Sequence, residues 1–147
     1  MNLFGVMEVS GSALKAERIR AEVVAANMAN AETTRTPDGG PYRRQHVVFS
    51  SSAAEPTTFA GQLLSQSALQ AGGVEVSPGV QDPTSTLRRF DPSHPDADKD
   101  GYVSYPDINP LTEMVDLMGA TRAYGLNSSA IQATKGMINS SLDILKS

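Results

Sequence analysis

The sequence predicts an α+β protein in which two long terminal helices pair with each other and a small β-rich module is inserted between them. Apolar and small residues recur every seven positions near both ends, whereas proline, glycine and short alternating segments fill the middle. A seven-residue spacing keeps one seam of a helix facing a partner helix along its length, as in a coiled coil. We therefore expect residues 1–36 and 109–147 to form one discontinuous coiled-coil domain and residues 37–108 to form the β-rich middle domain.

The first predicted helix begins at residue 3 and ends near residue 31. Alanine is frequent in it and no proline interrupts it, and both features favour a helix. A β-branched run before Pro37 ends it, because the residue before a proline avoids the helical conformation. The predicted assembly seam of this helix consists of Met7, Leu14, Ala21 and Met28, with Val24 beside them.

Proline and glycine divide the middle of the chain into short segments. Residues 37–41 combine two prolines, an aspartate and two glycines, which is a strong turn signal. A run of Ser, Ala, Pro and Thr near 50–60 indicates an exposed linker, and a short helix is expected at 59–71. Alternating patterns bounded by turn residues predict strands at 42–49, 74–76, 84–90 and 102–105.

The second long helix is predicted from about residue 111 to residue 145. Asn109 followed by Pro110 is a favourable helix start, because the Asn side chain can cap the first turn and proline suits its first position. Gly125 should cost about 1 kcal/mol relative to alanine. It indicates either a local packing accommodation, or a point of flexibility or close approach between neighbouring subunits. The predicted assembly seam of this helix consists of Leu117, Tyr124, Ile131, Ile138 and Leu145.

The charge balance argues against a nucleic-acid partner. The chain has a net charge of −4 and a pI of about 5.1, whereas binding to phosphates requires a basic face. The basic pairs at 43–44 and 88–89 are interpreted as solvated strand or loop ends, with subunit-contact charges as the functional alternative. Glu113 and Asp116, near the start of the second helix, are interpreted as solvated or capping residues.

Several classes of site are disfavoured. The chain has no cysteine, so disulfides and thiolate metal sites are excluded. The first residues lack a basic segment, and no run of eighteen apolar residues occurs, so we expect neither a secretory signal peptide nor membrane insertion. Two histidines without a recognisable nucleophile motif indicate no catalytic site, and we expect no cofactor.

One loop carries a metal-binding spacing and supports an alternative function, that of a soluble calcium-binding module. Acidic residues stand at loop positions one, three, five and twelve, with glycine at six, as in an EF-hand. An EF-hand requires helices on both sides, yet prolines flank this loop, and its last ligand is Asp where Glu is usual. The four candidate ligands are Asp96, Asp98, Asp100 and Asp107.

Two segments of the chain resemble the axial proteins of the bacterial flagellar rod and hook. The first is the asparagine-rich end of the N-terminal helix with the turn that follows, and the second lies in the C-terminal helix. The run at 36–43 narrows the resemblance to the proximal-rod members of that family. The residues that carry the resemblance are Asn27, Asn30, Pro37, Asp38, Gly39, Tyr42, Arg122 and Asn127.

The resemblance implies a non-enzymatic structural subunit of the proximal rod of the flagellar basal body. Such a subunit belongs to the hollow shaft that crosses the periplasm, transmits torque and surrounds the export channel. Its terminal helices would form an inner layer, and residues 26–42 would shape the join to the outer β-rich layer. The implied partners are other copies of itself, other rod proteins, the flagellar type III export apparatus and adaptor proteins at the MS ring or rod base. Export would proceed without a cleaved signal peptide.

Overall fold

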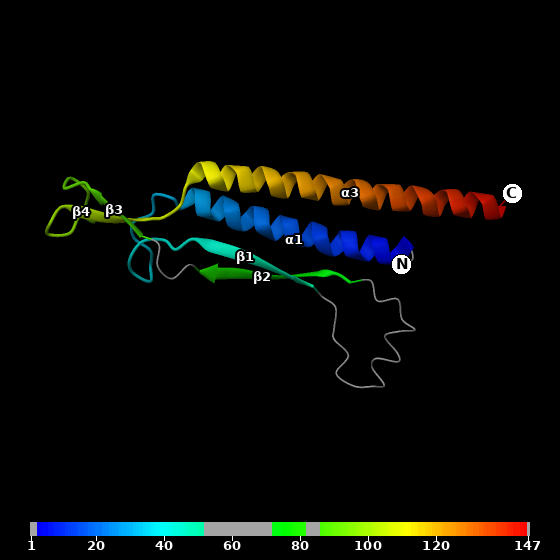
Figure 1. The fold of residues 1–147 in the computed structure, drawn as a ribbon, viewed down its shortest axis with the longest axis horizontal. Helices are drawn as coiled ribbons and strands as arrows, with labels where there is room; N and C mark the ends of the chain where they lie inside the picture. The colour runs from blue at the N-terminus through cyan, green and yellow to red at the C-terminus, as the bar shows by residue number, and fades with distance from the viewer. Residues whose placement is uncertain (1–2, 52–71, 82–85, 147) are drawn as a thin grey trace, which may run out of the picture. The chain divides into compact units, whose positions relative to one another are not determined.

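Two long helices packed together, with small β-sheets inserted between them, form the fold in the computed structural model (Figure 1). The structure describes residues 3–51, 72–81 and 86–146. The element order is α1 (Leu3–Ala29), β1 (Gln45–Ser51), β2 (Val74–Gln81), β3 (Thr86–Phe90), β4 (Tyr102–Pro106) and α3 (Pro110–Lys146). This arrangement confirms the predicted α+β fold class.

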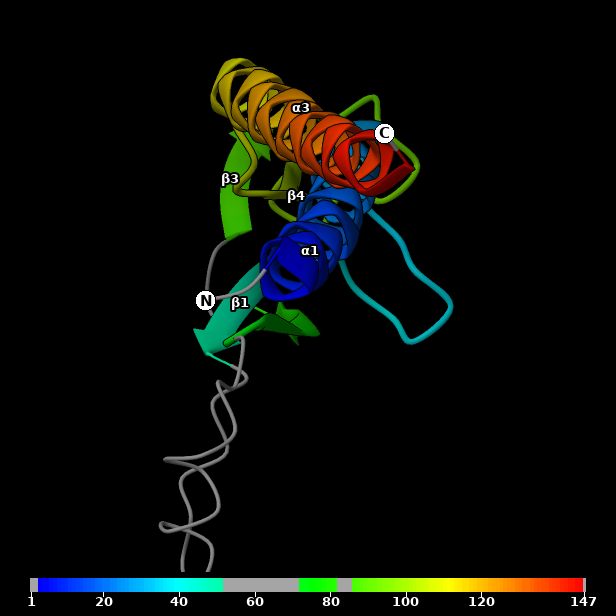
Figure 2. The same cartoon turned by 90° about the vertical axis from the view of Figure 1, so that its right-hand side faces the viewer.

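The described chain divides into two compact units. The hairpin unit contains residues 19–48, 77–81 and 86–119, and the terminal unit contains residues 3–18, 49–51, 72–76 and 120–146. The end of α1 meets the beginning of α3 in the hairpin unit, and the opposite ends belong to the terminal unit. Within each unit, the segments of the two helices therefore run antiparallel and lie side by side (Figures 1 and 2). The division at 36–37 and 108–109 that the sequence suggests stays a prediction.

Helix α1 begins where the sequence predicts and ends at Ala29, two residues before the expected end. The side chain of Asn30 caps it, because Nδ2 donates to the carbonyl oxygen of Ala26 at 2.9 Å. The predicted turn at 37–41 follows, with Gly39 and Gly40 at positive φ. The Thr36 amide donates to the carbonyl oxygen of Gly40 at 2.9 Å, which closes the turn.

Helix α3 begins with the predicted cap. The Oδ1 atom of Asn109 accepts the amide hydrogen of Leu111 at 3.0 Å, and Pro110 occupies the first helical position. The helix then continues to Lys146, so both predicted boundaries are right to within one residue. Neither described helix carries an apolar window long enough to span a bilayer.

The strands form two separate two-stranded sheets, β1 with β2 and β3 with β4. The β3–β4 pair is an antiparallel hairpin in which Phe90 faces Tyr102 and Leu87 faces Tyr105. Strand β2 continues to Gln81, so the predicted stop at 77–79 was wrong: pairing with β1 extends the strand past Gly79, which adopts a positive φ. Strand β1 runs to Ser51, into the expected linker, whereas 52–60 and the helix expected at 59–71 lie outside the described residues.

Few large apolar side chains are buried among the described residues. In the hairpin unit they are Val24, Val103 and Ile108, and in the terminal unit only Ala16 and Ala120 reach the same degree of burial. Small side chains allow helices to approach closely but remove little apolar surface from water. Buried polar groups therefore contribute an unusual share of the packing.

Candidate functional site

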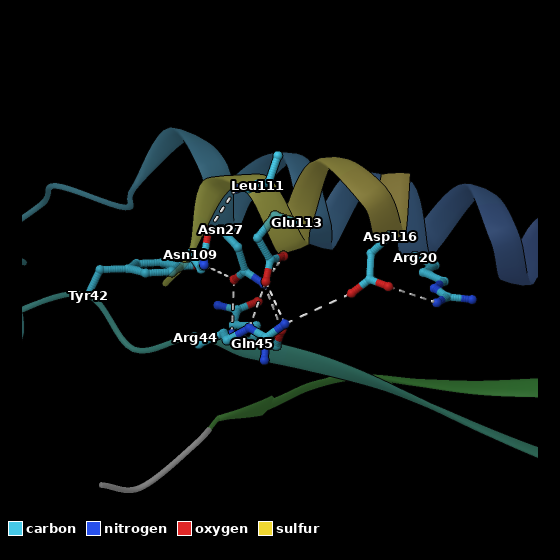
Figure 3. Close-up of polar contacts among 9 residues, drawn as sticks. All are labelled: Arg20, Asn27, Tyr42, Arg44, Gln45, Asn109, Leu111, Glu113 and Asp116. Atoms are coloured by element: carbon cyan, nitrogen blue, oxygen red, sulfur yellow. Dashed lines mark hydrogen bonds and ion pairs between the residues drawn. The ribbon is translucent and has the colours of Figure 1, made fainter. Parts of the chain in front are cut away.

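A cluster of polar side chains joins both helices to the beginning of β1 within the hairpin unit (Figure 3). We call Asn27, Tyr42, Arg44, Gln45 and Glu113 the polar clasp. Asn27 and Glu113 are each only 1% exposed. A buried polar group is stable only when its hydrogen bonds are made, so the partners of these two residues decide what the clasp does.

Asn27 of α1 makes four hydrogen bonds with its side-chain amide. Nδ2 donates to the Gln45 carbonyl oxygen at 2.9 Å and to Oε2 of Glu113 at 3.2 Å. Oδ1 accepts the Gln45 amide hydrogen at 3.0 Å and the Tyr42 hydroxyl hydrogen at 3.2 Å. These bonds use both donors and both acceptor positions of the amide. Asn27 thus joins the strand entry to the helix pair.

Glu113 of α3 is neutralised by an arginine that lies outside the helices. Nε of Arg44 lies 2.7 Å from Oε1 of Glu113, and Nη2 lies 2.5 Å from the same oxygen. The Arg44 side chain is itself 28% exposed. Because removal of one member of a buried ion pair leaves an uncompensated charge, loss of Arg44 should cost about 3–5 kcal/mol.

A second, more exposed ion pair flanks the clasp. Nη2 of Arg20 on α1 lies 3.5 Å from Oδ1 of Asp116 on α3, with 36% and 39% of their side chains exposed. Oδ2 of Asp116 lies 4.0 Å from Nη2 of Arg44. Pairs this exposed contribute about 1 kcal/mol or less, so Glu113, and not Asp116, dominates the electrostatics here.

The surroundings of Tyr42 shift its pKa. Burial of the phenol raises the pKa of Tyr42, and the nearby charge of Glu113 raises it further. Both effects disfavour the phenolate, and the neutral hydroxyl is the form that donates to Asn27. The clasp therefore requires Tyr42 in its protonated state.

The segment with EF-hand spacing begins in the connection between β3 and β4 and then includes β4 itself, so it contains a strand where an EF-hand has a helix, and Asp107 lies beyond that strand. Asp96 accepts a hydrogen bond from Thr34 at 2.8 Å and pairs with Arg35 at 3.1 Å. Asp98 accepts the amide hydrogens of Asp100 and Tyr102, each at 2.9 Å. Within the described residues, Asp96, Asp98, Asp100 and Asp107 do not gather into a group that could hold a metal ion.

The same loop is held by charge-assisted hydrogen bonds. Oδ2 of Asp98 lies 2.6 Å from Nη2 of Arg88, and the Arg88 guanidinium stacks over the Tyr102 ring. The amide of Tyr102, and less strongly the amide of Asp100 and the charge of Arg88, lower the pKa of Asp98. Asp98 therefore contributes hydrogen bonds that shape the hairpin, whereas Asp96 joins it to residues 34–35.

The remaining signature residues have local contacts. Asn30 caps α1 and also accepts the Thr33 hydroxyl hydrogen at 3.1 Å. Pro37, Asp38 and Gly39 form the exposed turn, and Arg122 is exposed on α3. Asn127 donates to the carbonyl oxygen of Ala123 in its own helix at 2.9 Å. The structure therefore brings only Asn27 and Tyr42 of this set into the clasp.

The predicted seams differ in burial. On α1, Val24 is buried and Met7, Leu14, Ala21 and Met28 are half-buried. On α3, Leu117, Ile131 and Ile138 are half-buried, whereas Tyr124 and Leu145 are 46% and 83% exposed. The fully buried positions of α3 are Glu113, Ala120 and Thr134, which also recur at multiples of seven. Small and polar residues thus line the centre of the helix contact, and the larger seam residues lie beside it.

Sequence reasoning missed Arg44, Gln45 and Glu113 as members of the clasp. The interpretation of Glu113 as a solvated or capping residue was wrong, because its side chain is buried against α1 and Arg44. The interpretation of Arg44 as a solvated strand end was also wrong, since it pairs within the chain. Glu113 lies seven residues before Ala120, and that spacing was a signal that it belongs to the buried row.

Comparison with known families agrees with this architecture. Residues 7–35 match the family described as flagella basal body rod protein, and residues 99–144 match the C-terminal family of the flagellar basal body rod FlgEFG proteins. Together the matches include most of both terminal helices and Asn27 and Glu113 of the clasp. They define the class as structural proteins of the flagellar rod, which are not enzymes.

Full-length relatives narrow this class. The flagellar basal-body rod proteins FlgC of Borreliella burgdorferi and Bacillus subtilis are each 40% identical, with alignments that cover 99% of this chain and 99% and 100% of the relatives. FlgC of Salmonella typhimurium is 35% identical over 98% of each chain. The chain belongs to the FlgC family of flagellar basal-body rod proteins. It is therefore a structural subunit of that rod, and the resemblance seen in the sequence is confirmed.

Proposed function

We propose that this subunit is held in the rod by the solvent-facing side of α3, which contacts neighbouring rod subunits. In the hairpin unit this side exposes 70% of Leu111, 48% of Met114, 56% of Val115 and 59% of Met118. Exposed apolar surface on one helix is typical of an interaction site, and methionine adapts its shape to a partner. We call these four residues the exposed α3 face, and their exposure is the main support for the proposal.

The terminal unit also exposes apolar side chains on its part of α3. The exposed large apolar residues of this part of α3 are Tyr124, Leu126, Met137, Leu142, Ile144 and Leu145. Two of the predicted seam residues, Tyr124 and Leu145, belong to this group, whereas Leu117, Ile131 and Ile138 are half-buried within the chain. We assign the first two to contacts between subunits and the other three to packing against α1.

The position of the subunit within the rod is inferred from the resemblance in the sequence. We propose that the subunit lies in the proximal rod, within the hollow shaft that transmits torque and surrounds the export channel. The proposed partners are further copies of the chain, other rod proteins and adaptor proteins at the MS ring or rod base. Delivery would use the flagellar type III export apparatus. Membership of the rod family supports assembly with rod subunits in general.

A pair of substitutions on the exposed α3 face tests the assembly role. Val115→Glu with Met118→Glu should abolish swimming and incorporation into basal bodies, because two charges would face an apolar partner surface. Thr112→Glu is the matched control, because Thr112 is also exposed on the first turns of α3. All variants should keep the helix content of the parent chain in circular dichroism. Normal incorporation of the double variant would overturn the proposal.

Photo-crosslinking in the same cells can identify the subunit that contacts the exposed α3 face. A photo-crosslinking residue in place of Met118 should capture a neighbour in assembled rods, and mass spectrometry would identify it. Recovery of a second copy or another rod protein supports the proposal. Absence of any rod subunit among the products, with rods intact, contradicts it.

A further inference from the structure

We propose that the polar clasp is a folding gate, in which Glu113 prevents stable pairing of α1 with α3 until the strand entry at 42–45 has docked. The terminal helices could otherwise pair through their small side chains alone. The gate makes helix pairing and strand docking a single cooperative event. It concerns folding of the subunit, so it does not rest on the assembly role of the exposed α3 face.

Helix α1 offers Glu113 a neutral hydrogen-bond donor and not a compensating charge. Within the described helix pair, Glu113 accepts a hydrogen bond from the neutral side-chain amide of Asn27 at 3.2 Å. The glutamate is 1% exposed, so water does not replace missing partners. One neutral hydrogen bond does not compensate a buried charge.

The charge that compensates Glu113 comes from Arg44. Arg44 makes both of its short contacts to Oε1 of Glu113, and it precedes β1 directly, outside either helix. Arg44 lies 69 positions from Glu113 along the chain. Compensation therefore depends on tertiary docking of the strand entry. Figure 3 shows Arg44 reaching Glu113 from just before the beginning of β1.

The hydrogen bonds of Asn27 depend on the same segment, residues 42–45. Three of its four hydrogen bonds involve Tyr42 or the backbone of Gln45, and only the fourth reaches Glu113. Without the docked segment, helix pairing would bury a charge together with an amide that has lost most of its partners. Asn27 and Glu113 thus each penalise pairing unless residues 42–45 are in place.

Spin-label distance measurements on the full-length chain test the gate directly. Ala25→Cys and Thr112→Cys place one label on each helix near the clasp, at exposed sites in a chain without other cysteines. The labelled parent should show one short, narrow distance. Arg44→Met should raise the ratio of unpaired to paired helices roughly a hundredfold, because it leaves Glu113 charged and buried.

The decisive variant removes both charges. Arg44→Met with Glu113→Met should restore the parental distance, although every contact of Arg44 is still absent, because the pairing helices no longer bury a charge. Arg43→Met is the matched control, since Arg43 is exposed beside Arg44, and it should leave the distance unchanged.

Three results would overturn the gate. The first is a parental distance in Arg44→Met, which would show that the arginine is not required for pairing. The second is a double variant no better paired than Arg44→Met, which would show that Arg44 acts through packing alone. The third is a labelled parent without a paired population, because the gate would then control nothing.

Discussion

Asn27 binds the backbone of Gln45 as a neighbouring β-strand would, by donating to its carbonyl oxygen at 2.9 Å and accepting from its amide at 3.0 Å. The side chain of a helical residue therefore makes the pair of hydrogen bonds that a neighbouring strand would make with the first residue of β1. This pairing satisfies backbone groups that would otherwise be left without partners at the join between helix and sheet. The strand entry is consequently anchored to α1.

Asn27→Asp should destabilise the chain strongly. The carboxylate cannot donate to Gln45 or Glu113, and it places a negative charge where Nδ2 now lies 3.2 Å from Oε2 of Glu113. We expect a loss of about 3–5 kcal/mol in the free energy of unfolding, measured by urea denaturation at neutral pH. Asn127→Asp is the control, because Asn127 bonds only a carbonyl of its own helix, and it should cost about 1 kcal/mol or less. Equal losses in the two variants would contradict the role of the clasp.

The stability of the clasp should fall at alkaline pH through Tyr42. Its pKa is raised in the folded state by burial and by Glu113, so the folded chain holds the phenolic proton more tightly than the unfolded chain does. The associated stability is fully present below the ordinary pKa of about 10 and is lost as pH rises through the folded value. Chemical denaturation as a function of pH should show a steeper alkaline decline for the parent than for Tyr42→Phe. If the stability of the parent and of Tyr42→Phe declined equally with rising pH, Tyr42 would not contribute to the alkaline loss of stability.

Gly101→Ala should weaken the β3–β4 hairpin. Gly101 adopts a φ of +79°, and an added Cβ would lie 2.9 Å from Cε2 of Phe90. Backbone strain and this contact together should cost about 1–3 kcal/mol, seen as a lower denaturant midpoint. Gly101→Asn should cost less, because asparagine tolerates positive φ while it meets the same ring. Equal costs would assign the effect to the ring contact alone.

Gly125→Ala should stabilise the isolated chain. An added Cβ at Gly125 would meet nothing within 4 Å among the described residues, so packing within the chain does not require glycine there. We expect a gain of about 1 kcal/mol in the free energy of unfolding, with a higher melting temperature. Gly136→Ala, which also meets nothing within 4 Å, should give the same gain.

The two glycine variants should differ in the assembled rod. If Gly125 provides a close approach between subunits, Gly125→Ala will impair incorporation into basal bodies despite its greater stability, and Gly136→Ala will not. Normal incorporation of both variants would exclude the close-approach interpretation and leave the glycine without a packing role.

Most of the helical framework could be predicted because its signals are local. The first residue of α1 and the Asn109–Pro110 start of α3 follow from propensity and capping, which depend on near neighbours. Strand β2 was predicted too short because Pro78 and Gly79 indicate a turn when read locally. Pairing with β1 overrides that local preference, and pairing between distant segments is not visible in either segment alone.

The candidate site was predicted only in part. Asn27 and Tyr42 were identified through the family resemblance, whereas Glu113 and Arg44 were interpreted as solvated charges. A charged residue near a helix start is usually exposed, and its sequence neighbours do not show that an arginine far along the chain will cover it. The exposure of Tyr124 and Leu145 was likewise invisible, because a seven-residue seam does not indicate how far a partner helix extends.

The sequence by itself determined the class of fold, the approximate helix boundaries and the flagellar rod family, because each depends on local propensity or on short sequence motifs. The tertiary structure decided which polar residues are buried, how Glu113 is neutralised and which side of α3 stays exposed. Burial and charge compensation depend on distances between segments that are remote in the chain. Local pattern therefore specifies the helices, whereas three-dimensional contact specifies the clasp that joins them to the sheet.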